Sequence, residues 1–279
     1  MKKTALLLVF CLVISGILMA QDDADNSPVR FPFETGILID NHTYVTPFKG
    51  MLEYRIQHRF GPVTNGITDL FGIYAPSNIR MALNYGITDK LMVGIGSTKD
   101  YKLQDLQWKY AILQQTESGS MPVSLTYYGN MVIDARENEV FYPEENYRFI
   151  HRLSYFTQFI VGRKFNDVFT FQAAPALAYY NAVDTTYQNI NVGLSLGGRA
   201  KILPQMSIIA EYGMPLYVSE ESEAKPNLSL GVEIGTATHA FQIFLATYDQ
   251  IVPQRNLVYN TNDFTEGDLL LGFNITARF

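Results

Sequence analysis

From residue 50 onward, apolar and polar side chains alternate along the chain with a period of two. Between Leu52 and Phe60 every second residue is apolar or aromatic, apart from one histidine, and the residues between them are charged or polar. Residues 190–202 and 269–279 repeat the pattern. Because successive side chains of a strand point to opposite faces, the alternation predicts strands with one apolar and one polar face. No stretch shows a comparable amphipathic helix, and we predict an all-β fold.

The same reading of the whole chain predicts about twelve strands, each close to the roughly 9–11 residues or more that a tilted membrane strand needs. They fall near residues 50–60, 77–86, 90–98, 101–114, 121–134, 149–162, 168–180, 188–202, 206–218, 226–236, 239–247 and 268–279. Every second connection is short, whereas four of the others are long: 61–76, 135–148, 219–225 and 248–267. Short turns at one end and long loops at the other are typical of outer-membrane barrels. The sequence therefore predicts a transmembrane antiparallel up-and-down β-barrel whose C-terminus lies at the short-turn end.

A soluble β-sandwich or a lipocalin-like barrel would show the same alternation with its apolar face turned inward. Two features favour the membrane barrel. The polar face is enriched in Gly, Ser, Asn, Gln and Arg, which suits a wet lumen, and the apolar face carries many aromatic residues, which suits interfacial girdles. Only 17% of the residues are charged, whereas about 25% is usual in a soluble domain.

Residues 1–20 have the composition of a secretory signal peptide, with two lysines, an unbroken apolar stretch and a small residue at the end. We expect cleavage there, so that the mature chain starts near Gln21. The single cysteine, Cys11, lies inside this stretch, so the mature chain has no thiol for a disulfide, a zinc site or a nucleophile. The mature chain divides into a lead segment, 21–49, and the barrel, 50–279. Alternation in the lead segment is weak, which leaves open whether it lies in the periplasm, adds a strand or folds into the lumen.

The chain has 21 basic and 27 acidic residues and a net charge of −6. Removing a signal peptide with two lysines and no acid brings the mature chain to −8. A nucleic-acid binder needs a basic face, and no basic cluster interrupts this chain, so we exclude nucleic acid as a partner. The partners we expect are outer-membrane lipid and lipopolysaccharide, the barrel-assembly machinery and, for an open lumen, small solutes.

The polar face of the strands places charged side chains in the lumen. We expect the lining to include Arg55, Arg59, Arg80, Lys109, Arg152, Arg199, Lys201, Arg278, Glu53, Asp105, Asp134, Glu211 and Glu233. One interpretation is a mildly anion-selective channel, because rings of charged side chains set selectivity in pores. The other is that these residues pair across the interior and brace or close the barrel, since buried charges must be paired. Eight strands fill their own interior and sixteen leave a channel, so a barrel of about twelve is compatible with both.

The chain offers little for catalysis or metal binding. The long loops are rich in acidic residues that could bind calcium through oxygen ligands, but none has the spacing of a dedicated site, and a solvated acidic surface is the simpler interpretation. Outer-membrane phospholipases with this architecture use a neighbouring histidine and serine, and none of the four histidines here has a serine two residues further on. We therefore predict that the protein is not an enzyme and has no cofactor and no metal site.

Three segments are the most distinctive of the chain: RIQHRFG at 55–61, APSNIR at 75–80 and KLQDL at 102–106. With most of the mature chain, they resemble an outer-membrane β-barrel family of the domain-of-unknown-function type found in Bacteroidota-type bacteria. The resemblance implies the barrel and a location in the outer membrane of a Gram-negative envelope, and it supplies no activity and no catalytic residue. The chain ends in Phe279 on the apolar face of the last predicted strand, and a terminal aromatic of this kind resembles the recognition signal for outer-membrane insertion.

Two functions follow from these patterns. The first is a narrow passive channel, porin-like, for small anionic or zwitterionic solutes. The second is a closed structural or docking barrel for other envelope proteins, without transport or catalysis. For the channel we expect the loop 61–76 to fold inward as a constriction fixed by Arg59 and Arg80, because it is flexible and carries an apolar run, LFGIY, at 70–74.

Overall fold

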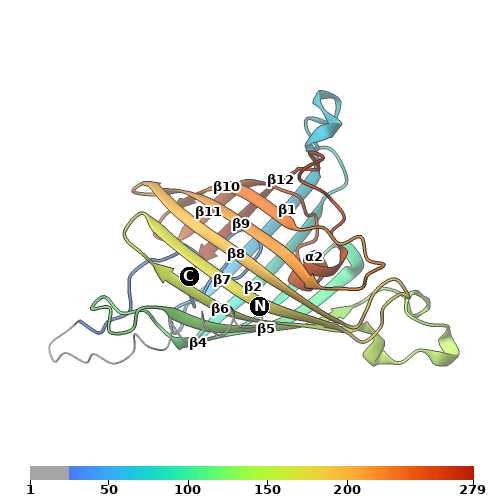
Figure 1. Ribbon diagram of the computed structural model, residues 1–279, viewed down its shortest axis with the longest axis horizontal. Coiled ribbons are helices and arrows are strands. Elements are labelled where there is room, and N and C mark those ends of the chain that lie inside the picture. The colour runs from blue at the N-terminus through green and yellow to red at the C-terminus, as the bar shows by residue number, and fades with distance from the viewer. Residues whose placement is uncertain (1–24) are drawn as a thin grey trace, which may run out of the picture.

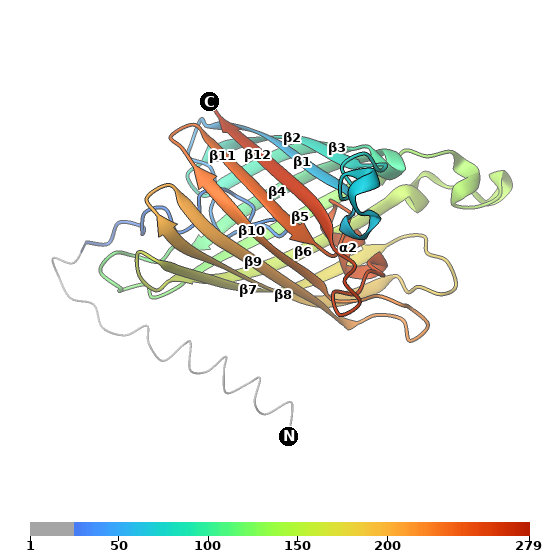
Figure 2. The same cartoon turned by 90° about the horizontal axis from the view of Figure 1, so that it is seen from above.

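The computed structural model describes residues 25–279, so the predicted signal peptide lies outside the described residues. Twelve antiparallel strands form one closed barrel, in which each strand pairs with its neighbours in sequence and the last pairs with the first (Figures 1 and 2). The strands are β1 (Leu52–Pro62), β2 (Asn78–Thr88), β3 (Leu91–Thr98), β4 (Leu103–Leu113), β5 (Ser124–Asp134), β6 (Leu153–Lys164), β7 (Phe169–Tyr180), β8 (Ile190–Leu203), β9 (Met206–Tyr217), β10 (Asn227–Gly235), β11 (His239–Ala246) and β12 (Leu270–Arg278). The predicted fold class is confirmed.

The barrel wall has its polar face inside and its apolar face outside, the reverse of a soluble protein. In β1, Glu53, Arg55 and Arg59 are buried, and on β3 the side chain of Ile95 is 59% exposed. Large apolar side chains are exposed in the same way on most other strands, among them Leu83, Leu106, Phe159, Phe171, Leu230 and Ile243. An apolar outer band around a polar interior is the pattern of a membrane barrel. Within residues 25–279, no helix is long and apolar enough to cross a membrane.

The observed strand ends lie within a few residues of those predicted. The largest difference is at β6, which starts at Leu153 and not at residue 149, because Phe149–Arg152 form a short 3-10 helix, η6. A side chain of this helix caps its N-terminus: the His151 ring nitrogen Nδ1 accepts a hydrogen bond from the backbone N–H of Arg148 at 3.2 Å. Over these four residues the chain therefore forms a short helix in place of the predicted start of the strand.

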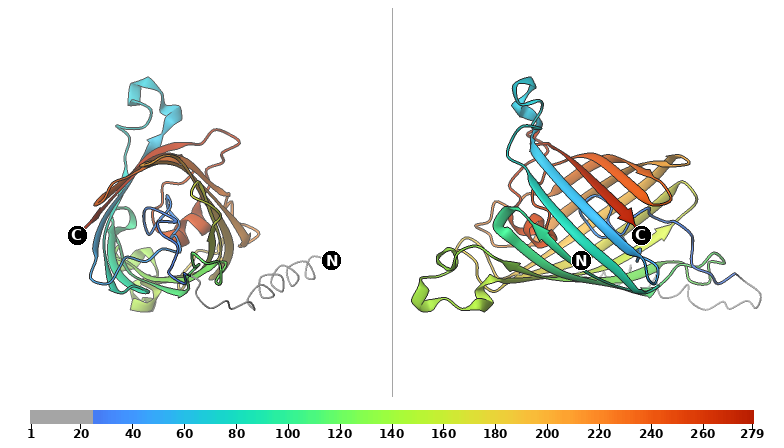
Figure 3. Two further views of the ribbon diagram at one scale, coloured as in Figure 1. Left: turned by 90° about the vertical axis from the view of Figure 1, so that its left-hand side faces the viewer. Right: turned by 180° about the vertical axis from the view of Figure 1, so that it is seen from behind.

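The lead segment runs into the barrel from its short-turn end. Residues 28–29 first pair with the turn between β4 and β5, where Val29 N–H donates to the carbonyl of Gln115 at 2.9 Å. Residues 33–47, which we call the plug segment, then enter the lumen, turn back at Leu38–Asn41 and return to the start of β1. The end-on view in Figure 3 shows this segment inside the ring of strands. Ile37, Leu38 and Ile39 are at most 1% exposed.

A second element fills the lumen from the long-loop end. The connection between β11 and β12 carries the helix α2 (Pro253–Tyr259), which lies inside the mouth of the barrel beside β6 to β9 (Figure 3). The helix begins with Pro253, a residue that suits the first helical position because it has no N–H to leave unpaired. Its side chains Gln254, Asn256 and Val258 are buried. The barrel interior is therefore occupied from both ends.

The loop 61–76 does not fold inward, and the constriction predicted for it is wrong. Figure 3 shows it projecting away from the barrel wall, and Ile67 and Tyr74 in it are 72% and 77% exposed. The loop folds on itself, because the N–H of Gly61 donates to the carbonyl of Gly72 at 2.9 Å and brings the two ends of the loop together. Gly72 has a φ of +90°, and a Cβ there would meet the Gly61 carbonyl, so glycine is required at this contact.

Candidate functional site

Most of the charged residues predicted to line the lumen fall into three groups, and the first group pairs within the barrel wall. Arg55 forms a buried ion pair with Glu53 on the same strand. Arg80 donates two hydrogen bonds to Asp105, at 2.7 and 2.9 Å, and a third to the side-chain oxygen of Gln57 at 2.8 Å. A buried charge is costly unless it is paired. Each of these pairs is neutral overall, so it does not attract a charged solute.

The second group binds the acidic side chains of the lead segment. Arg199 contacts Glu34 at 2.6 Å and Glu233 at 3.4 Å. Arg59 lies 3.5 Å from a carboxylate oxygen of Asp40, and Arg278 donates to the backbone carbonyl of Glu34. Both acids belong to the plug segment, so the plug neutralises part of the positive charge of the wall.

Two further wall residues, Glu211 and Lys109, bind the backbone of the plug segment. Glu211 accepts hydrogen bonds from the N–H groups of residues 39, 40 and 41 at 2.9, 3.0 and 3.0 Å, and from the Tyr248 hydroxyl at 3.2 Å. The Lys109 ammonium donates to the carbonyls of Gly36 and Val45 at 2.7 and 2.9 Å. These charge-assisted bonds satisfy the polar backbone of a turn that lies away from water.

The wall also has recesses for the apolar side chains of the plug segment. A Cβ on Gly162 would lie 2.1 Å from the ring of Tyr44, and one on Gly197 would lie 2.7 Å from Leu38. Glycine at both positions is therefore what gives these side chains room. The His42 ring stacks on Tyr128 with 3.6 Å between ring centroids. Shape and polar contacts together define one seated position of the plug.

Three predicted lining residues do not join these contacts: Asp134, Arg152 and Lys201. Asp134 pairs with Arg136 at the outer rim. Arg152 lies at the outer rim, where it donates to the backbone carbonyl of Asp134 at 2.7 Å and to the Asn138 side chain at 2.5 Å. Lys201 is half-buried near the short-turn end, without an ion pair among the described residues. The structure brings the other predicted lining residues together around the plug segment. Phe279 is 75% exposed at the end of β12.

The plug segment and α2 meet in the middle of the barrel. The side-chain amide of Asn256 donates to the Asp40 carboxylate, and Gln254 exchanges two hydrogen bonds with Asn130 of β5, at 3.1 and 3.0 Å. Next to this contact the interior retains cavities of about 30 and 10 Å³, lined among others by Asp40. Such volumes have room for about one water molecule. In this structure the bore is closed to solutes.

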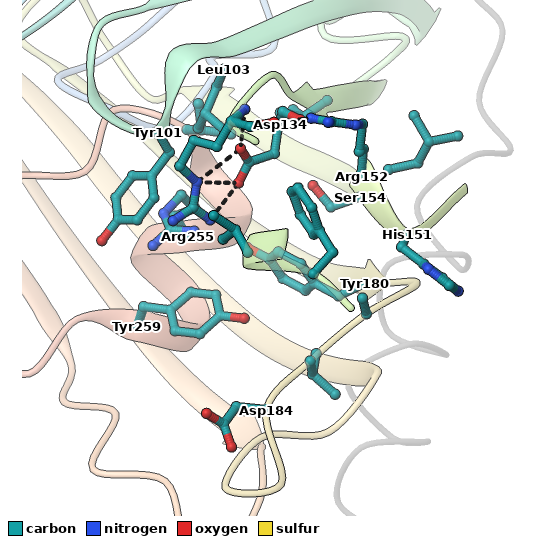
Figure 4. A pocket seen from close by; sticks show the side chains of 18 residues that line it. Tyr101, Leu103, Asp134, His151, Arg152, Ser154, Tyr180, Asp184, Arg255 and Tyr259 are labelled. Atoms are coloured by element: carbon teal, nitrogen blue, oxygen red, sulfur yellow. Dashed lines mark hydrogen bonds and ion pairs between the residues drawn. The ribbon is translucent and has the colours of Figure 1, made fainter. Parts of the chain in front are cut away.

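A larger pocket of about 320 Å³ lies on the outer side of α2 (Figure 4). The loops after β3, β5 and β7 and the helix α2 contribute its walls. The lining includes the three arginines Arg136, Arg152 and Arg255, the carboxylates Asp134 and Asp184, and the rings of Tyr101, Phe141, Tyr180 and Tyr259. Concave sites of this size with convergent polar groups are typical of small-molecule binding. Across residues 25–279, by contrast, no group of three or more His, Cys, Asp or Glu side chains could hold a metal ion.

The arginines of this pocket differ in how far they are already paired. Arg136 makes a two-point contact with Asp134, including bonds of 2.6 and 2.9 Å. Arg255 lies over the rings of Tyr101 and Tyr259, at 3.6 and 4.6 Å from the ring centroids, and donates from Nε to Gln250 at 2.9 Å. Its two terminal amino groups have no hydrogen-bond acceptor among the described residues. Burial raises the pKa of Tyr259 to about 12, so this phenol is neutral and faces Arg255 with its ring.

Sequence reasoning identified the wall residues but not their partners or this pocket. Arg255 and Tyr259 lie in the predicted loop 248–267, where no alternation marks an inward direction. The one available signal is Pro253, which suits the start of a helix.

A closed barrel with an apolar outer band, a polar interior, short turns at one end and long loops at the other is a membrane-spanning β-barrel of the porin type. The chain belongs to the family of membrane-bound β-barrel domains designated DUF5777, whose model matches residues 33–279. The predicted resemblance to a β-barrel family of unknown function is confirmed. Transmembrane β-barrels of this kind lie in the bacterial outer membrane, and the predicted location is likewise confirmed.

Solved structures with a similar fold are mainly channels. An outer membrane channel from Pseudomonas putida F1 has a TM-score of 0.51 and 11% identity, and the match covers 85% of this chain and 98% of that one. The KdgM porin has a TM-score of 0.50 and 6% identity, covering 82% and 99%. An outer membrane phospholipase A from Escherichia coli has a TM-score of 0.42 and 12% identity, covering 87% and 97%. No protein with a curated function matches the sequence. The likenesses to the two channels show the fold, and the absence of enzyme activity stays a prediction.

Proposed function

We propose that this barrel is a gated channel for small anionic or zwitterionic solutes, and that the plug segment with α2 forms its closed state. The observation that carries this proposal is that a separate stretch of chain, and not the wall itself, fills the bore. Twelve strands at about 4.8 Å spacing and a tilt of about 40° form a barrel with a backbone radius of about 12 Å. Such a barrel is wider than one of roughly eight strands, whose own side chains can fill the interior.

The way in which the plug segment is attached to the barrel favours a movable gate and not a permanent filling of the bore. The plug segment adds no strand to the wall, and it joins β1 through a turn at Gly50, where a φ of +82° lets the chain reverse. The wall behind it consists of charged and amide side chains such as Arg59, Gln107 and Glu211. A wall of this kind is compatible with water in the bore once the plug has left.

The charges of the plug support a preference for anions in the open state. Glu34 and Asp40 contact Arg199 and Arg59. When the plug leaves, it takes both carboxylates with it, and the wall becomes more positive by the same amount. Charged side chains that line a pore set its selectivity, so the open bore should favour anions.

The second candidate is a closed structural or docking barrel, which the small volume of the interior cavities favours. Single-channel conductance in a planar bilayer separates the two candidates. We would compare the mature chain with a variant that lacks residues 25–48 and has α2 replaced by a short Gly-Ser linker, after checking on a gel that both fold into heat-modifiable barrels. We expect rare openings for the mature chain and steady, anion-selective conductance for the variant. A folded variant that stays silent would refute the channel and leave the docking barrel.

A further inference from the structure

Two side chains of the pocket at the long-loop end, Arg255 and Tyr180, have hydrogen-bond donors without an acceptor in the described part of the chain. The terminal amino groups of Arg255 have no acceptor among the described residues. The hydroxyl of Tyr180, a side chain that is 8% exposed and lines the same pocket, is a buried polar atom without a hydrogen-bond partner. Buried polar groups are nearly always hydrogen-bonded, so an unpaired one that lines a cavity points to a missing partner.

The cationic group is also fixed in place before any ligand arrives. Arg255 lies over the rings of Tyr101 and Tyr259 and donates from Nε to Gln250. These contacts restrict the guanidinium to one orientation, so less entropy is lost when it binds a carboxylate. Arg136 and Arg152 are different: Arg136 already makes a two-point contact with the Asp134 carboxylate, and both terminal amino groups of Arg152 donate to loop carbonyls and to the Asn138 side chain.

We propose that this outer pocket binds a small organic anion that carries a carboxylate on a six-membered ring. The carboxylate accepts from Arg255, and the Tyr180 hydroxyl donates to an oxygen of the same ligand. The ring of the ligand lies against the aromatic side chains of the pocket, Tyr101, Phe141 and Tyr259. A volume of about 320 Å³ accommodates a single ring with its substituents. Because the pocket lies on the outer side of α2, this binding does not require the bore to open.

Isothermal titration calorimetry on the refolded mature protein tests the site with benzoate, glucuronate and benzamide. Benzoate and glucuronate share the carboxylate and differ in the ring, so they distinguish an aromatic ligand from a sugar acid. Benzamide has the shape of benzoate without its charge. We expect at least one of the two carboxylates to bind, and benzamide to bind about tenfold more weakly than benzoate or not at all.

Three variants locate the binding. Arg255→Gln should weaken binding of the carboxylate about tenfold, and Tyr180→Phe should weaken it about threefold while leaving the fold intact, because it removes only an unpaired hydroxyl. Arg163→Gln is the matched control, since Arg163 lies at the other end of the barrel over Phe165 and should bind like the parent. The proposal is overturned when neither carboxylate binds the parent protein, when benzamide binds as well as the carboxylate that binds, or when Arg255→Gln binds that carboxylate like the parent.

Discussion

The carboxylate of Glu211 is the strongest single contact between the wall and the plug segment, and removing it should release the plug. It accepts three backbone N–H bonds of 2.9–3.0 Å from residues 39–41. A hydrogen bond to a charged group contributes about 1.5–3 kcal/mol. Three such bonds would contribute at least about 4.5 kcal/mol, but water that enters beside a smaller side chain recovers part of that loss, so we assign about 3 kcal/mol to Glu211→Ala. This corresponds to about a hundredfold change in the equilibrium between seated and released plug.

Hydrogen exchange reports this equilibrium directly. In the seated plug the amide of Thr43 donates to the carbonyl of Gly36 at 3.0 Å, and that of Leu38 to Asn41 at 2.9 Å, so both should exchange slowly. Glu211→Ala should speed exchange of these amides about a hundredfold while the amides of the strands keep their protection. In a planar bilayer the same variant should open more often than the parent.

Asp105→Ala is the matched control for this experiment. Asp105 is a buried wall carboxylate whose hydrogen bonds go to Arg80 of the wall and not to the plug backbone. It should lower the stability of the barrel and leave the ratio of plug to strand exchange unchanged. If Glu211→Ala and the parent exchange alike at residues 38–43, the carboxylate does not determine the seating of the plug, and the reasoning from these contacts is refuted.

Four further outcomes are expected. Gly162→Val should push Tyr44 out of its recess, an overpacking that costs about 1–3 kcal/mol, and raise plug exchange about tenfold without changing the gel mobility of the folded barrel. Arg199→Ala should leave the buried Glu233 without its ion-pair partner and lower the free energy of unfolding by about 3–5 kcal/mol, measured by urea titration in detergent; an unchanged midpoint would argue against bracing. Replacing residues 64–74 by a short Gly-Ser linker should leave conductance unchanged, because that loop lies outside the bore. Replacing Phe279 by serine should reduce the amount of folded protein in the outer membrane of expressing cells, and normal assembly would exclude its role as an insertion signal.

The barrel wall could be predicted from the sequence because a strand with one wet and one lipid face must alternate, and each lipid-facing side chain is then visible at every second position. The same alternation predicts the position of most charged residues of the lining, such as Glu53 and Arg80. The prediction for the loop 61–76 is wrong because its apolar run indicates only that these side chains avoid water, and it does not indicate whether the loop lies inside or outside the barrel.

The plug segment could not be placed from the sequence for a different reason. Glu211 and Lys109 bind backbone N–H and C=O groups of the plug, and every residue has those groups, so no side-chain pattern marks the partner. The plug also alternates too weakly to predict a strand. The helix α2 has seven residues, fewer than the window in which a helical period can be recognised.

The position of the plug constrains how the protein is assembled. Its contacts join residues far apart in sequence: Ile39 to Glu211 across 172 positions, and Ile39 to Asn274 across 235. The seam between β1 and β12 likewise joins the two ends of the chain. Contacts of this range form late, because closing long loops costs entropy before it is repaid. The contacts of the plug with Glu211 of β9 and Asn274 of β12 can form only once these late strands are in place, so seating of the plug is one of the last steps of assembly.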